Sequence, residues 1–221
     1  MDQKKLDQQS QHWETSFSNK PEMFGLEPSY SAQKALEIFK KNNINYIVEL
    51  GAGLGRDTIY FAQNSIFVEA IDYSPTGIKI INKKAKKLNL SKFIKTKIHD
   101  IRQKLPFPDR SFQGCFSHML YCMALSSFNL KNLNQEVYRV LKSGGVNVYT
   151  VRHNEDGDYQ KGIHRGEDLY ENDGFIVHFF SKNKINQLST GFEILDIEKF
   201  EEGKFPRKLF KVTLKKKSLT G

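Results

Sequence analysis

The chain has 221 residues, 38% of them hydrophobic, and 34 Lys+Arg against 25 Asp+Glu give it a net charge of +9. That length is typical of one domain with a sizeable core and some decorations, and it argues against two full domains. Much of the positive charge is on scattered lysines, such as Lys83, Lys84, Lys86 and Lys87 on one predicted helix. This pattern favours a solvated basic face over a nucleic-acid-binding surface.

Cysteine usage and the N-terminus bear on the compartment. The two cysteines, Cys115 and Cys122, both lie in a hydrophobic stretch, which favours buried thiols in a reducing environment and offers no metal-ligand spacing. Residues 1–11 are polar and charged, and no run of about 18 apolar residues is long enough to span a bilayer. We therefore expect a cytoplasmic protein with no signal peptide, no membrane attachment and no metal. The oligomeric state stays open.

In chain order, residues 1–45 read as mostly helical, with four apolar anchors, Trp13, Phe17, Met23 and Phe24. Short apolar runs then alternate with helix-like stretches, which is typical of a parallel sheet flanked by helices. The predicted strands cover 46–50, 66–71, 93–98, 112–117 and 146–151. The predicted helices cover 56–63, a stretch after Pro75, and 130–141, with Gly144-Gly145 as the expected C-cap of the last one.

The pattern changes after the fifth strand. Residues 152–174 are polar and read as a loop, a short helix is expected near 181–188, and residues 192–200 and 208–214 alternate like antiparallel strands. The prediction is an α/β fold with a Rossmann-like doubly wound sheet in a single domain, 1–221. Within it, 1–45 form a helical N-terminal cap, 46–151 a ligand-binding core, and 152–221 an acceptor loop and a terminal strand pair.

A glycine-rich turn joins the first strand to the first core helix. Its glycines are Gly51, Gly53 and Gly55, so the pattern is G-x-G-x-G, and Arg56 stands where a dinucleotide-binding G-x-G-x-x-G needs its third glycine. Glu49 precedes the turn and would repel a pyrophosphate, whereas a carboxylate suits the sulfonium and ammonium of S-adenosylmethionine (SAM). Asp57 near the start of the helix also fits a simpler role as a cap or first-turn acid.

Three further elements point to the same edge of the sheet. Asp72 ends the second strand, 21 positions after Gly51, where such an acid accepts hydrogen bonds from ribose hydroxyls, although it can also cap the helix at Pro75. Asp100 and Ile101 follow the third strand, and Ser117-His118 end the fourth. Ligands of open α/β sheets bind at the carboxyl ends of the strands, so all of these residues are expected to converge on one crevice.

These residues carry a family likeness. The run Glu49–Asp57, the acid in Ala70–Pro75, His99-Asp100 and the run Arg139–Gly145 resemble class I SAM-dependent methyltransferases, with Ser143 where that family commonly has proline. Gly55–Thr58 is similar to the tellurite-resistance-type branch of small methyltransferases. The resemblance implies a sheet of seven strands with the last one antiparallel, and S-adenosylhomocysteine as the product.

The resemblance also implies roles for individual residues. Gly51 and Gly53 would lie beside the methionine part of SAM, Asp72 on the ribose and Tyr73 against the adenine, which Asp100 and Ile101 would frame. Ser117 and His118 would line the floor near the methyl group. The N-terminal anchors would form a lid or simply pack on the sheet. The predicted cofactor-binding set is Glu49, Gly51, Ala52, Gly53, Arg56, Asp57, Asp72, Tyr73, Ser74, Asp100, Ile101 and Ser117.

Candidates for the catalytic residues come from the segments after the fourth and fifth strands. His118 and Tyr121 are candidates for proton removal from an oxygen or nitrogen acceptor, with a structural role as the alternative for His118. Arg152 and His153 begin the polar loop, which we expect to form the acceptor pocket because long polar connections in compact domains are usually functional. The spacing of His153, His164 and His178 matches no metal site.

The leading hypothesis is therefore an enzyme that methylates a small molecule. An RNA or protein methyltransferase is the alternative suggested by the net charge, but basic residues interleaved with exposed aromatics are missing, which argues against a nucleic-acid partner. A nicotinamide-dependent oxidoreductase is disfavoured by Arg56. A SAM-binding protein without turnover stays open.

Overall fold

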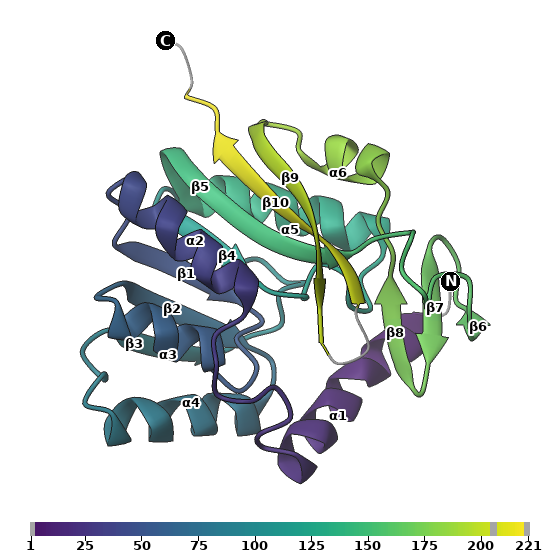
Figure 1. Ribbon diagram of the computed structural model, residues 1–221, viewed down its shortest axis with the longest axis horizontal. Coiled ribbons are helices and arrows are strands. Elements are labelled where there is room, and N and C mark those ends of the chain that lie inside the picture. Colours follow the sequence, from purple (N-terminus) through teal and green to yellow (C-terminus); the bar gives the residue numbers. More distant parts are fainter. Residues whose placement is uncertain (1–2, 204–206, 219–221) are drawn as a thin grey trace.

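The computed structural model describes residues 3–203 and 207–218, so the two ends of the predicted domain, 1–2 and 219–221, lie outside the described residues, as do 204–206. Its core is a seven-stranded sheet in the order β3-β2-β1-β4-β5-β10-β9 (Figure 1). The first five strands in that order are parallel, and β10 runs antiparallel to both of its neighbours. The predicted Rossmann-like sheet with a reversed last strand is confirmed.

The helices and strands follow in chain order. They are α1 Gln3–Asn19, α2 Tyr30–Lys41, β1 Tyr46–Leu50, α3 Arg56–Gln63, β2 Phe67–Asp72, α4 Pro75–Lys87, β3 Ile94–Ile98, β4 Phe112–Ser117, α5 Ser127–Val140, β5 Leu141–Arg152, β6 Ile163–His164, β7 Leu169–Asn172, β8 Phe175–His178, α6 Lys182–Leu188, β9 Phe192–Glu202 and β10 Arg207–Lys216.

Two apolar layers enclose the sheet. On one face, buried residues of α2, α3 and α4 pack on the alternate side chains of β1, β2 and β4, such as Ile47, Val68 and Phe116. On the other face, buried residues of α5 and α6 belong to one apolar cluster with Val48 and Ile71. This alternation follows from the two-residue period of a strand, which sends neighbouring side chains to opposite faces.

The N-terminal cap consists of two helices with different positions. Helix α2 joins the sheet layer, whereas α1 lies apart from it and runs from α4 to β8 (Figure 1). No helix among the described residues is long and apolar enough to cross a membrane.

Two expectations about local structure were wrong. Helix α5 ends at Val140 with Leu141 already extended as C-cap, so Gly144 (φ 73°) bends the start of β5 and caps no helix. Residues 152–174 are not all loop, because they contribute β6 and β7 to an antiparallel sheet that β8 completes. Three strands are short here, and two of them carry charged or aromatic residues without clear alternation, which hid them from a periodicity argument.

Candidate functional site

A cavity of about 660 Å³ opens at the carboxyl ends of the parallel strands. It lies where the chain order of the sheet reverses, between β1 and β4, which is the usual ligand position in open α/β sheets. Its lining includes Glu49, Gly51 and Asp72 from the β1 and β2 ends, His118 from the end of β4, and Arg152 from the end of β5. The predicted convergence of these strand ends on one crevice is therefore observed.

The glycine turn shapes the floor of this cavity. Gly51, Gly53 and Gly55 all have positive φ (70°, 53° and 79°), a conformation that favours glycine. Gly55 is the left-handed N-cap of α3. The Gly53 N–H donates to Asp72 Oδ2 at 2.8 Å and the Ser74 N–H to Asp72 Oδ1 at 2.8 Å, so Asp72 holds the turn against the start of α4.

Two buried carboxyl groups lie beside the turn. Burial raises the pKa of Asp72 to about 6, against the lowering effect of its two backbone N–H donors. Burial also raises the pKa of Glu49 well above its usual value, and the neighbouring Asp57 adds to this while the Thr58 hydroxyl, which donates to Glu49 Oε2 at 2.5 Å, opposes it. Each carboxyl group lacks a cationic side chain in hydrogen-bond contact among the described residues, so a cationic ligand would stabilise the ionised forms.

The charges of the cavity lining differ from those of the whole chain. The lining contains six carboxylic residues, Glu49, Asp57, Asp72, Asp158, Asp173 and Glu202, but only three arginines, Arg56, Arg152 and Arg207. The chain as a whole carries a net charge of +9. The cavity is thus an acidic region inside a basic protein.

An aromatic layer from the N-terminal segment covers the cavity. Trp13, Phe17, Met23 and Phe24 all contribute to its lining, and the three rings contact one another at centroid distances of 5.5 to 6.3 Å. The predicted lid residues therefore lie over the glycine turn.

Glu14 attaches this layer to the core. Its carboxylate accepts hydrogen bonds from the Ser74 and Thr76 hydroxyls and from the Thr76 N–H at the start of α4. These donors outweigh burial and lower the pKa of Glu14. The N-terminus of a helix stabilises such a negative charge, so α1 is held to α4 directly beside Asp72.

His118 lies in a chain of polar contacts that joins four segments. Its Nδ1 is 2.8 Å from Ser31 Oγ and 3.0 Å from Thr150 Oγ1, and its Nε2 is 3.2 Å from Glu202 Oε2. Glu202 also accepts from Arg56 Nη2 at 3.3 Å. Both ring nitrogens of His118 therefore have partners in the chain.

The predicted first-turn acid Asp57 has a different principal contact. Its carboxylate accepts from the Ser29 N–H and the Ser29 hydroxyl, both at 2.8 Å. It thereby anchors the N-cap residue of α2, while it still contributes to the cavity lining. Asp57 thus joins α2 to the glycine turn.

Arg152 is almost fully buried, with 3% of its surface exposed. Its Nε donates to Asp156 Oδ2 at 3.0 Å, and its Nη2 donates to Asp156 and to Asp158 Oδ2. These contacts outweigh the effect of burial and raise the pKa of the guanidinium. Arg152 thus forms part of the cavity wall as a fixed, charge-balanced group.

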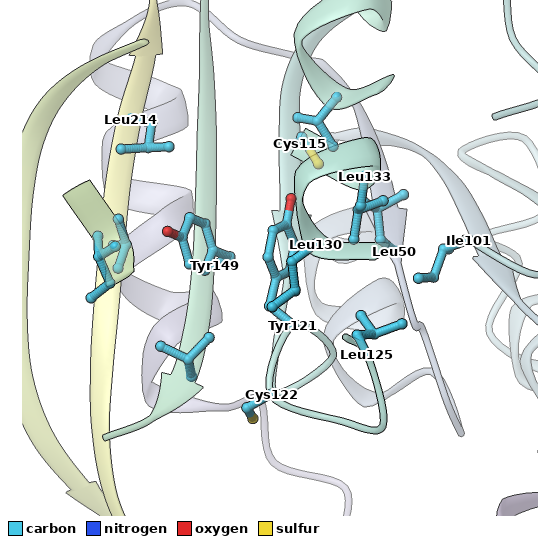
Figure 2. Packing of buried hydrophobic residues seen from close by; sticks show 14 of the residues in the cluster. Leu50, Ile101, Cys115, Tyr121, Cys122, Leu125, Leu130, Leu133, Tyr149 and Leu214 are labelled. Atoms are coloured by element: carbon cyan, nitrogen blue, oxygen red, sulfur yellow. The ribbon is translucent and has the colours of Figure 1, made fainter. Parts of the chain in front are cut away.

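Several predicted site residues lie away from the cavity. Tyr121 is 1% exposed and stacks on Tyr149 at a centroid distance of 4.4 Å. Figure 2 shows both side chains among the buried hydrophobic residues. His153 packs against Phe210, and its Nδ1 accepts from the Glu155 N–H. Neither contributes to the lining, because the chain after β4 turns Tyr121 inward and the register of β5 turns His153 to the side opposite Arg152.

Three of the predicted cofactor-binding residues also lie outside the lining. Asp100 is occupied by Arg102, whose Nε and Nη2 donate to its carboxylate. Ser74 is the N-cap of α4 and Ser117 is fully buried. The other members of that set, Glu49, Gly51, Ala52, Gly53, Arg56, Asp57, Asp72, Tyr73 and Ile101, all line the cavity.

Some lining residues were not predicted. Glu202 lies at the end of β9, far along the chain from His118, and no local spacing identifies it. Met119, which belongs to the predicted element at the end of β4, also lines the cavity and has a positive φ of 63°, an unusual conformation for a side chain of its size. Only the three-dimensional arrangement reveals Glu202.

Known proteins resemble the core of this chain in sequence. Residues 47–145 match the family model described as "Methyltransferase domain". A demethylmenaquinone methyltransferase of Tropheryma whipplei is 31% identical over 99 residues, which are 45% of this chain and 38% of that relative. The match therefore spans well under half of the relative's length.

Solved structures share the fold at lower identity. A SAM-dependent methyltransferase of Methanosarcina mazei is similar with a TM-score of 0.68 and 20% identity, over 78% of this chain and 92% of that chain. The 1,6-didemethyltoxoflavin-N1-methyltransferase of Burkholderia thailandensis, solved with 1,6-didemethyltoxoflavin and S-adenosylhomocysteine, gives a TM-score of 0.74 and 15% identity, over 95% and 87%.

Proposed function

We propose that the protein transfers a methyl group from SAM to a small-molecule acceptor, a proposal supported by the match of residues 47–145 to the methyltransferase domain model and by the shared fold. The observation that carries the proposal is the acidic cavity over the glycine turn, with the buried carboxyl groups of Glu49 and Asp72 in its wall. A cation fits such a cavity better than the pyrophosphate of a dinucleotide does, because carboxylates repel a pyrophosphate.

The residues present fit the donor. The backbone at Gly51 and Gly53 would lie beside its methionine part, Glu49 would face its positive charge, and Asp72 would accept hydrogen bonds from its ribose hydroxyls. Tyr73 and Ile101 would contact the adenine. When bound, SAM supplies an electrophilic methyl group. The aromatic layer of the N-terminal segment would exclude water, and the cavity wall would hold the acceptor in line.

Proton removal needs no dedicated group if the acceptor is a soft or already ionised nucleophile. Both nitrogens of His118 are occupied by Ser31, Thr150 and Glu202. We therefore assign His118 to positioning Glu202 and the turn after β4, and Arg152 to the acceptor pocket. Tyr121 and His153 have no role in this proposal, because neither lines the cavity.

A small acceptor is favoured over RNA by the sign of the cavity's charge. A polyanion approaching six carboxylic residues and three arginines meets net repulsion. Two of the similar proteins also favour a small acceptor. Their names give demethylmenaquinone and 1,6-didemethyltoxoflavin as substrates, and both are small molecules. That the acceptor of this chain is a small molecule stays a prediction. That the chain belongs to the tellurite-resistance-type branch also stays a prediction.

Ligand-dependent thermal unfolding tests the donor. SAM or S-adenosylhomocysteine at 100 times its Kd should stabilise the protein by about 2.7 kcal/mol, and NAD should not. Asp72→Ala should abolish this stabilisation, while Asp196→Ala, at an exposed residue of β9, should leave it intact. Stabilisation by NAD alone would refute the proposal. Transfer of a radiolabelled methyl group to a panel of small molecules would then identify the acceptor.

A further inference from the structure

The cavity has a second half that the donor-binding residues do not account for. It lies over the ends of β4, β5 and β10, away from Asp72, Tyr73 and Ile101 at the β2 and β3 ends. Five apolar side chains contribute to its lining, namely Met119, Leu120, Met123, Val177 and Leu209. An apolar ligand gains free energy by leaving water for such a surface.

One polar group in this half has an unused hydrogen-bonding capacity. Arg152 Nε and Nη2 donate to Asp156 and Asp158, but Nη1 forms no hydrogen bond with any residue in the described ranges 3–203 and 207–218. Arg152 also contributes to the lining of the cavity. A guanidinium has donors only, so the N–H groups of Nη1 are available to an oxygen in the cavity.

Arg152 is fixed in place before any ligand arrives. Its side chain is 3% exposed, Asp156 holds it through two nitrogens, and its guanidinium lies over the Phe179 ring at 5.4 Å. A donor that is already oriented loses little conformational freedom when it binds a ligand. Arg152 is therefore suited to select one chemical group.

The charges around this half balance. The carboxylates of Asp156 and Asp158 both pair with Arg152, and with Arg207, which also lines the cavity, these four charges sum to zero. Glu202 is paired with Arg56 and His118, and the exposed Asp173 lies on the turn between β7 and β8, where water screens it. A charged ligand would lose its hydration here without gaining a counter-charge.

From these observations we propose that the methyl acceptor is an uncharged, largely apolar small molecule, and that it receives a hydrogen bond from Arg152 Nη1 on a carbonyl-type oxygen. The inference rests on the proposed methyl transfer. It goes further by naming the class of acceptor and Arg152 as the residue that selects it.

Four naphthalene probes of nearly equal size test the inference on protein saturated with S-adenosylhomocysteine. They are 2-acetylnaphthalene, 2-ethylnaphthalene, 2-naphthoate and 2-naphthylmethylamine, and calorimetry gives the Kd of each. The ketone should bind at least about 10-fold more tightly than the ethyl compound, because a hydrogen bond to a charged donor contributes roughly that much. Both charged probes should bind more weakly than the ketone.

Variants assign the preference to Arg152. Arg152→Lys keeps the charge and removes Nη1, so the ketone preference should fall to about 2-fold or less. Arg165→Lys is the matched control, because Arg165 pairs with Glu171 nearby and does not line the cavity; it should keep the preference. Asp158→Asn, at a side chain that is 53% exposed, adds one net positive charge and should strengthen 2-naphthoate binding.

Each outcome decides a separate point. The inference would be overturned if the unaltered protein bound 2-naphthoate or 2-naphthylmethylamine most tightly of the four probes. It would also be overturned if Arg152→Lys kept the full preference for the ketone. If Arg152→Lys fails to fold, the probe affinities of the unaltered protein and of Asp158→Asn still test the inference. A protein that binds S-adenosylhomocysteine without any probe preference refutes this inference alone, whereas no binding of S-adenosylhomocysteine refutes the proposed function.

Discussion

Gly77, in the first turn of α4, packs directly under the glycine turn. A Cβ built at this position would lie 2.5 Å from the Gly53 carbonyl oxygen, while ordinary contacts begin at 3.4 Å. In Gly77→Ala the turn and the helix must therefore separate by about 0.9 Å (3.4 minus 2.5). The atom in the way is backbone, so no side chain can rotate to relieve the contact.

The stability cost can be estimated from two opposing effects. Overpacking a close contact costs about 1–3 kcal/mol, and replacing glycine by alanine in a helix returns up to about 1 kcal/mol. We expect a net loss of about 1–2 kcal/mol, which for a chain of this size is a fall of roughly 3–6 °C in Tm.

The effect on ligand binding should be larger than the effect on stability. Displacing Gly53 disturbs its N–H bond to Asp72, on which the ribose is expected to depend. The Kd for SAM should rise at least about 10-fold, because a 1 Å misplacement in a binding site can have that effect. Calorimetry and thermal unfolding measure both quantities. Gly157→Ala is the control, since nothing lies within 4 Å of a Cβ there. Unchanged SAM binding in Gly77→Ala would refute the reasoning.

Two further predictions concern the carboxyl groups near the donor. Burial raises the pKa of Asp72 to about 6, and the ionised carboxylate is the better partner for ribose hydroxyls. The Kd for SAM, measured by calorimetry, should therefore rise as the pH falls from 7.5 to 5, by at most about 10-fold per pH unit. In Asp72→Asn the Kd should not change with pH in this way. Glu14→Gln weakens the attachment of α1 to α4 and should speed SAM dissociation several-fold in stopped-flow measurements with little change in association; equal changes in both rates would contradict a role for α1 as a lid.

The sequence predicted the sheet well because local signals specify it. The strand-turn-helix at Gly51–Arg56 and the acid at Asp72 depend on backbone conformation and on the period of buried strands, both of which can be read within a short window. The number of strands in the main sheet and the reversal of its last strand followed from the family likeness. The sheet of β6, β7 and β8 did not emerge, because its strands are short and stabilised by partners elsewhere in the chain.

The lining of the cavity was predicted less completely, and the differences have a common cause. A residue next to a strand end can point toward the ligand or away from it, and sequence position alone does not distinguish the two. Tyr121 and His153 point into the core, while Asp100 is taken by Arg102, two residues further on. Glu202 was missed because its partner His118 lies far away in sequence.

The acidic lining of the cavity has a consequence for turnover. Six carboxylic residues against three arginines favour ligands that carry positive charge. In the proposed reaction, a donor that enters as a sulfonium cation would leave as a neutral thioether, so the same wall would hold the reactant more firmly than the spent product. The cavity would then resist inhibition by the product of that reaction, and turnover would continue as the ratio of product to donor in the surroundings rises.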